Sequence, residues 1–212
     1  MTERNDSRPR RELPGLRERR RRQTCRDLAD AAIDLFERHG VHGTTTDDIA
    51  EAAGISARTF FRYAATKENA IFLDRDPVES ALHRESDQSV TEAEALMMIE
   101  DLLIDRLERF DAEAPDQHHR ALRARRLILS EPSLLALALA LDAEDVDHLT
   151  GTVLTMAPHA DELRVRTLVT AVGTMIRLAI DEWARRAELG DTVSTRSLYD
   201  QIRRGFEGFF TR

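Results

Sequence analysis

Residues 44–67 read TTTDDIAEAAGISARTFFRYAATK, and this stretch decides the fold that we expect. Thr46 offers a side-chain acceptor just before an acidic pair, which is typical of the start of a helix. Gly54 is placed to end that helix, because glycine adopts the left-handed conformation that closes helices. Ser56 is placed to cap the next helix. The pattern predicts two short helices joined by a tight turn, which is a helix-turn-helix.

The second predicted helix begins at Ala57 and carries arginine, threonine and aromatic side chains. Such a composition suits a groove lined with phosphates. The hydroxyls and neighbouring amides of Thr44, Thr45 and Thr46 are placed to hold a DNA phosphate at the start of the first helix. A simple capping role is the alternative for Thr46, and it is compatible with phosphate binding.

The composition of the 212 residues indicates an all-α fold of about nine helices, because helix formers dominate while Gly and Pro are scarce. Residues 135–141 alternate Leu and Ala as a strand would, but both are strong helix formers, so we expect a helix there. Apolar patterning and capping signals predict later helices over residues 91–112, 115–129, 132–156, 161–188 and 195–210. A helix from Lys67 to about Glu85 would cross Asp76-Pro77, which should kink or split it.

The net charge of −8 is unevenly distributed. Residues 1–26 contain ten arginines and four acids, a charge of +6, whereas residues 76–212 contain 16 arginines and 26 acids, a charge of −10. The basic segment attracts a polyanion locally, while the acidic remainder discourages non-specific binding. Five arginines are placed to enter a DNA minor groove, where the negative potential favours guanidinium groups: Arg17, Arg19, Arg20, Arg21 and Arg22. A plain solubilising tail is the alternative.

Five motifs surround and fill the opening stretch: Ala32-x-x-Leu35-Phe36, His39-Gly40, Thr45-Thr46-x-x-Ile49-Ala50-x-x-Ala53-Gly54-Ile55-Ser56, Thr59-Phe60-Phe61-Arg62-Tyr63 and Thr66-Lys67-Glu68. In this order and spacing, over about residues 22–72, the chain resembles the tetracycline-repressor (TetR) family of bacterial transcriptional regulators. The resemblance implies an N-terminal three-helix helix-turn-helix domain and a C-terminal helical domain that binds an effector and dimerises.

The resemblance also implies which side chains face DNA. The implied DNA-binding residues are Thr45, Thr46, Ala57, Arg58, Thr59, Phe61, Arg62, Tyr63 and Lys67, whereas Ile49, Ile55 and Phe60 are implied to pack inward. Lys67, the only lysine, matches a position that contacts phosphate in the family.

Two departures from the family pattern fall in the same region. Ala64-Ala65 stands where the family most often has an aromatic followed by a small residue or proline, so a core anchor is missing. If the space stays empty, the seat of the reading helix is weakened by roughly 2–4 kcal/mol, and we expect Phe60, Phe61 and Phe72 to compensate. Phe61 stands where tyrosine is frequent, so one hydroxyl-to-phosphate bond is absent.

Along the chain we expect a disordered basic arm over residues 1–16, a helix-turn-helix domain over 17–66, and an effector-binding and dimerisation domain over 67–212. The single cysteine excludes an internal disulfide and a thiolate metal cluster. No apolar run approaches the ~20 residues that span a bilayer. We expect a bacterial cytoplasmic protein without a membrane partner, associated with the nucleoid when bound to DNA.

The last two predicted helices carry apolar stripes that suit either a monomer core or an interface. Family members dimerise through the corresponding two helices, so the resemblance implies a homodimer. The candidate interface residues are Leu168, Met175, Ala179, Trp183, Leu198, Ile202, Phe206 and Phe209.

The middle helices are expected to enclose an effector pocket. Its candidate lining residues are Leu103, Arg123, Leu127, Leu137, Leu141, Val172, Thr174, Ile176 and Arg177. A filled core with solvated arginines is the alternative for each of them. The composition suggests a small, mostly apolar effector, lipophilic or acyl in kind, with an anionic part that an arginine meets.

No feature supports catalysis, a metal or a cofactor. The seven histidines show no repeated ligand spacing, and neither a glycine-rich phosphate loop nor a nucleophile elbow is present. The sequence therefore predicts a ligand-responsive regulator, a repressor that an effector releases from a palindromic double-stranded operator. The alternatives are an activator of the same family, or a helical small-molecule-binding or protein-interaction module whose DNA head is weakened.

Overall fold

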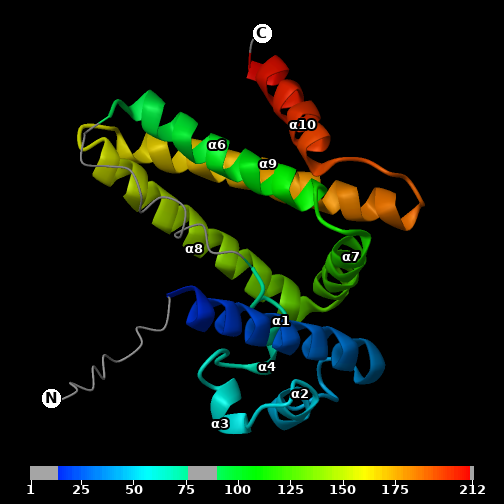
Figure 1. Cartoon of the computed structure of the whole chain (residues 1–212). Helices are drawn as coiled ribbons and strands as arrows, with labels where there is room; N and C mark the ends of the chain where they lie inside the picture. The colour runs from blue at the N-terminus through cyan, green and yellow to red at the C-terminus, as the bar shows by residue number, and fades with distance from the viewer. Residues whose placement is uncertain (1–13, 76–89, 211–212) are drawn as a thin grey trace, which may run out of the picture. The chain divides into compact units, whose positions relative to one another are not determined.

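The computed structural model describes residues 14–75 and 90–210, with side chains as far as residue 206 (Figure 1). The described residues form nine helices and no strand, which confirms the all-α prediction. The chain divides into two compact units, residues 1–75 and 76–212, and each is described by itself below. The boundary expected from the sequence lies after residue 66. The difference arises because the segment from Lys67 to Arg75 packs with the first unit.

The first unit contains α1 (Pro14–His39), α2 (Thr46–Ala52), α3 (Ala57–Phe60) and α4 (Lys67–Ala70). In Figure 1, α1 packs against α2 and α4, and α2 packs against α3. Apolar residues of the C-terminal half of α1 form the core with those of the short helices, and Leu28, Ile49 and Phe60 are fully buried. The predicted inward packing of Ile49 and Phe60 is thus confirmed, while Ile55 is half-buried.

The ends of these helices follow local signals with one correction. The N-cap of α2 is Thr45 and not Thr46: its hydroxyl accepts from the amide of Asp48, whose carboxylate accepts from the amide of Thr45. Gly54 has φ +68°, so the glycine closes α2 in the left-handed conformation as predicted. Ser56 caps α3, also as predicted, and Thr66 caps α4.

The expected fourth helix is short. α4 ends at Ala70 and continues as turns to residue 74. The rest of that prediction, including the Asp76-Pro77 step, lies outside the described residues, as does most of the expected arm over residues 1–16.

The second unit contains α6 (Glu92–Asp111), α7 (Pro115–Ser130), α8 (Pro132–Met156), α9 (Glu162–Glu188) and α10 (Thr195–Phe210). A capping box of Thr91 with Glu94 begins α6, at the residue where the sequence predicts a helix to start. α9 packs against α6, α7, α8 and α10 (Figure 1). One apolar cluster joins α6, α8 and the first half of α9, and a second joins α6, α10 and the second half of α9. Among the described helices, none is both long and apolar enough to cross a membrane.

Candidate nucleic-acid interface

Three side chains form the outward face of the turn that begins with α3. Arg58, Phe61 and Arg62 are all exposed, and their spacing of three and four residues places them on one face of a helical turn. Of the other residues predicted to read DNA here, Ala57, Thr59 and Tyr63 are half-buried. The face therefore presents two guanidinium groups and an aromatic ring.

This face is held in place by its caps and by the core beneath it. The amide of Thr59 donates to the hydroxyl of Ser56 at 3.2 Å, and the two hydroxyl groups lie 2.9 Å apart. Phe60 points into the core with no exposed surface. The turn that carries Arg58, Phe61 and Arg62 is thus anchored at its start by hydrogen bonds and in its middle by burial of a phenylalanine.

The start of α2 offers fewer hydroxyl groups than the sequence suggests. The hydroxyl of Thr44 is buried and donates to the carbonyl oxygen of Gly40 at 2.9 Å, so it is a structural group and not a surface donor. Thr45 is exposed and Thr46 half-buried. The pKa of the Asp48 carboxyl is lowered, first by the hydrogen bond with the Thr45 side chain and then by that with the Thr45 backbone.

Lys67 ties α4 to the beginning of α2. Its Nζ donates to the main-chain carbonyl oxygen of Thr44 at 2.9 Å, across 23 residues of sequence. The ammonium group carries three N–H donors, so this bond leaves it able to meet a phosphate as well. The structure thus places the cation beside the capped start of α2, where Thr45 and Thr46 lie.

Ala64, the position that lacks the family's aromatic side chain, is buried with 3% exposure. Its amide donates to the carbonyl oxygen of Phe60 at 3.0 Å, which ties the end of the reading turn to its middle. Of the three phenylalanines expected to compensate, Phe60 is fully buried and Phe72 half-buried, whereas Phe61 is exposed. Phe61 therefore faces outward and does not fill the space at Ala64.

The predicted arm arginines are helical. α1 begins at Pro14, so the exposed residues Arg17, Arg19, Arg20, Arg21 and Arg22 belong to its first turns. Burial begins only near Leu28, and the first half of α1 is exposed or half-buried. Because they are helical, these guanidinium groups point to several sides of α1 and have defined positions along its axis. Proline suits the first helical position, because it lacks an N–H that this position does not use.

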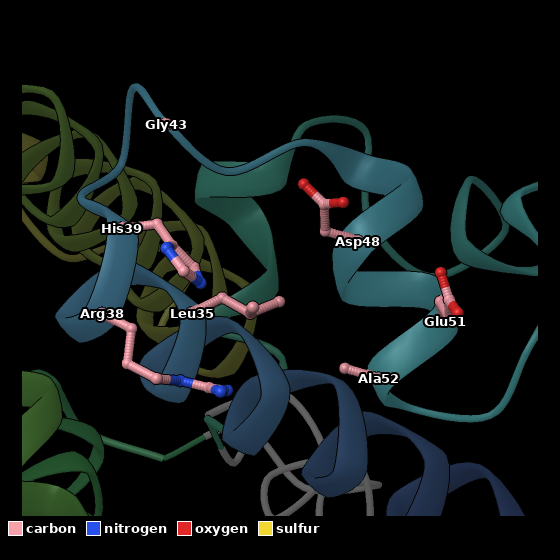
Figure 2. A pocket seen from close by; sticks show the side chains of 7 residues that line it. All are labelled: Leu35, Arg38, His39, Gly43, Asp48, Glu51 and Ala52. Carbon is pink, nitrogen blue, oxygen red and sulfur yellow. The ribbon is translucent and has the colours of Figure 1, made fainter.

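A shallow hollow of about 520 Å³ lies between α1 and α2 in the first unit. Figure 2 shows its lining residues, which are Leu35, Arg38, His39, Gly43, Asp48, Glu51 and Ala52. Gly43 is required by the turn, because a Cβ there would lie 2.3 Å from the carbonyl oxygen of His39. The walls carry charges of both signs and are open to solvent, so the hollow does not select one class of ligand.

The predicted pocket residues lie in the second unit. Leu103 and Leu127 are buried, and the other seven candidates are half-buried: Arg123, Leu137, Leu141, Val172, Thr174, Ile176 and Arg177. Val172 and Ile176 pack against both apolar clusters. Arg177 pairs with Asp142 at 3.2 Å.

Four of the predicted interface residues are interior to the chain. Met175, Ala179, Trp183 and Leu198 belong to the second apolar cluster, so they pack within the unit. Ile202 is half-buried and packs against the same cluster, whereas Leu168 and Phe206 are exposed. The side chain of Phe209 lies outside the described residues.

Sequence reasoning missed several polar contacts between helices. Arg125 pairs with Asp181 across α7 and α9, and the Arg125 Nε is buried without a hydrogen-bond partner. Asp111, at the end of α6, accepts from the amides of Thr195 and Arg196 at the start of α10. Each contact joins residues more than 50 positions apart, so no local spacing indicates it. Across the described ranges, no group of three or more His, Cys, Asp and Glu is placed to hold a metal ion.

Residues 28–71 match the family model described as bacterial regulatory proteins, tetR family. This match confirms the resemblance over the core of α1, over α2 and α3, and into the turns after α4. The matched family consists of transcriptional regulators and not enzymes, in agreement with the prediction that the chain is not an enzyme.

Two curated relatives each match part of the chain. A candidate mycofactocin biosynthesis transcriptional regulator, MftR, of Mycobacterium tuberculosis is 55% identical over 53 residues, which are 25% of this chain and 26% of that protein. The HTH-type transcriptional regulator TcmR of Streptomyces glaucescens is 40% identical over 68 residues, 32% of this chain and 30% of that protein. The match thus spans less than a third of either relative.

Proposed function

We propose that this chain, which carries a TetR-family helix-turn-helix over residues 28–71, is a DNA-binding transcriptional regulator and acts as a ligand-released repressor. The observation that carries the proposal is the exposed face of Arg58, Phe61 and Arg62, set in the same unit as the capped start of α2 and Lys67. Arginines at base edges specify a sequence, whereas contacts to phosphate fix the position of the protein on the duplex.

The roles divide along those lines. Arg58, Thr59 and Tyr63 read base edges in the major groove. Thr45, Thr46, Arg62 and Lys67 hold phosphates. The arginines of the first turns of α1 add attraction to the adjacent backbone, which makes affinity fall with salt.

A homodimer is part of the proposal, because a two-fold protein matches a palindromic operator with half-sites roughly 34–36 Å apart. One row along α9 supports it: Leu163, Thr167, Thr170, Thr174 and Leu178 share a face by their helical spacing and carry no charge. The leucines at the two ends of this row are 74% and 46% exposed. Burial of the row against its copy in a second chain removes apolar surface from water.

The effector that we propose is small and mostly apolar, bound among α6, α7, α8 and α9 and anionic at one end. Two observations support it: Val172 and Ile176 lie where the two apolar clusters meet, and Arg125 holds a buried N–H without a partner. A carboxylate would satisfy that N–H. Binding that favours a different separation of the two reading heads releases the operator.

A gel shift tests the function. The purified chain is titrated onto the intergenic DNA that flanks its own coding region, over a range of salt concentrations, with a scrambled duplex of equal length as control. We expect sequence-specific retardation that weakens as salt rises. Equal affinity for both duplexes at every salt concentration would contradict the proposal and favour a binding module with an inactive DNA head.

Two further measurements address the finer parts of the proposal. Reporter expression with and without the gene distinguishes a repressor, whose loss raises expression, from an activator, whose loss lowers it. A thermal-shift screen with fatty acids and acyl compounds addresses the effector, and absence of stabilisation by any of them would count against the class proposed here.

A further inference from the structure

Phe61 is 57% exposed although it directly follows a fully buried phenylalanine. Its ring meets the ring of Phe60 nearly at right angles, with centroids 5.6 Å apart and planes at 85°. Such an edge-to-face pair is a preferred aromatic geometry. Because Phe60 is fixed in the core, its ring holds Phe61 in a defined outward direction.

The neighbours of this ring on the exposed face are cationic. Arg58 lies three residues before Phe61 and Arg62 directly after it, and both are exposed. Arginines at these positions draw the face toward phosphates and guanine edges. A phenyl ring has neither a conventional donor nor an acceptor, so it gains nothing from the polar atoms of a base edge. The apolar feature that the major groove does offer is the C5-methyl group of thymine.

We infer that Phe61 reads a thymine through its C5-methyl group, so that each half-site of the operator carries an A·T pair opposite this ring. The inference rests on the proposed function and adds a specificity determinant to it. Arg58 and Arg62 bring the face to the groove, and Phe61 selects against a pair that lacks the methyl group. A ring packed against the sugar and phosphate backbone would be indifferent to that methyl, which makes the methyl the right group to test.

The experiment starts from the operator that the purified full-length protein selects from a random duplex pool. Each thymine is replaced in turn by uracil, symmetrically in both half-sites, which removes the methyl and leaves the base-pairing edge unchanged. Affinities are measured for the native chain and for Phe61→Ala. Met97→Ala is the matched control, since Met97 is an exposed apolar side chain of α6 that belongs neither to the proposed DNA face nor to the proposed dimer interface.

For the native chain we expect one position per half-site at which uracil weakens binding by about fourfold per half-site, the amount expected for one buried methyl. Phe61→Ala should bind the thymine operator more weakly and lose that sensitivity to uracil. Met97→Ala should retain it. If a melting curve indicates that Phe61→Ala is unfolded, Phe61→Gln, which keeps bulk against Phe60, takes its place.

The outcomes separate this inference from the proposed function. A pool in which no sequence is enriched would contradict the function itself. Specific enrichment with no uracil effect, or with an equal uracil effect in the native chain and in the Phe61 variant, would overturn the thymine contact and leave the regulator intact.

Discussion

The Nζ of Lys67 donates to the carbonyl oxygen of Thr44 at 2.9 Å, and this bond joins α4 to the loop that enters α2. Thr44 is itself fixed, because its buried hydroxyl donates to the carbonyl oxygen of Gly40. The residues that follow it, Thr45 and Thr46, form the proposed phosphate site. A displacement of α4 is therefore transmitted to that site through this hydrogen bond. This gives the proposed release mechanism a defined atomic starting point.

Lys67→Met is expected to weaken binding to all DNA sequences alike. Methionine keeps most of the aliphatic stem but removes the charge and the donor to Thr44. The slope of log affinity against log salt should fall by about 0.9 for each phosphate that the protein no longer neutralises. Stability of the first unit should drop by about 0.5–1.5 kcal/mol, because the hydrogen bond to Thr44 is removed. Affinity titrations at several salt concentrations and urea unfolding measure the two effects.

Arg109→Met is the matched control for Lys67, since Arg109 is an exposed cation of α6 that pairs with Asp105. It should leave the salt slope unchanged. A Lys67 variant with the native slope and weakened affinity would mean that Lys67 positions the loop without touching phosphate.

Arg58→Ala is expected to relax base preference. A bidentate contact of arginine with guanine is worth about 1–3 kcal/mol of discrimination, so the ratio of operator to scrambled affinity should shrink by that amount per half-site. The measurement is competition between the selected operator and variants of each base pair. A uniform loss of affinity, with the ratio preserved, would assign Arg58 to phosphate instead.

Helix boundaries can be predicted from the sequence because their signals are local. Thr91 with Glu94, Pro132 and Thr195 each mark the start of a helix where the structure has one. In contrast, the surface against which an apolar stripe packs cannot be predicted from the neighbouring sequence. Trp183 has the same spacing whether it packs against α6 and α10 or against another chain, and the structure places it inside. The hydrogen-bond acceptor of Lys67 also cannot be predicted from the sequence, because tertiary packing alone brings the carbonyl group of Thr44 beside it.

Asp111→Ala is expected to destabilise the second unit by about 1–3 kcal/mol, because it leaves amides at the start of α10 without their acceptor. The native carboxylate accepts from the amide of Thr195 at 2.8 Å and from that of Arg196 at 3.0 Å. Urea unfolding followed by circular dichroism measures the loss. Asp105→Ala, which removes an exposed carboxylate from the same helix, should change stability by less than about 0.5 kcal/mol. If the two variants lose the same unfolding free energy, the hydrogen bonds between Asp111 and the start of α10 add no stability of their own.

Leu178→Glu is expected to dissociate the proposed dimer and to leave the monomer folded. Leu178 is exposed, so a charge there costs nothing in the single chain but would be buried in the uncharged row of α9. Sedimentation at micromolar concentration should give the monomer mass. Trp183→Ala provides the contrast, because loss of this core side chain should cost about 3–5 kcal/mol of unfolding free energy. If the unmodified chain also sediments with the mass of a monomer, the proposed dimer is contradicted.

Tyr199 makes the stability of the second unit sensitive to alkaline pH. It is fully buried and its hydroxyl donates to Oε1 of Glu100 at 2.6 Å. Burial, followed by the hydrogen bond and charge of Glu100, raises the pKa of this phenol well above its usual value near 10. Because the folded-state pKa is raised, the stabilising contribution is complete below the unfolded pKa and is lost as pH rises beyond it.

In the Tyr63→Phe variant, Tyr199 is the only tyrosine, so phenolate absorbance reports it alone. We expect no phenolate while the helices persist, and joint appearance of phenolate and loss of helical circular dichroism as the pH rises past about 10. Adding Glu100→Gln removes the neighbouring charge, so phenolate should then form at a lower pH. Phenolate that forms near pH 10 with the helical signal intact would show that Tyr199 is open to solvent and would refute the buried contact with Glu100.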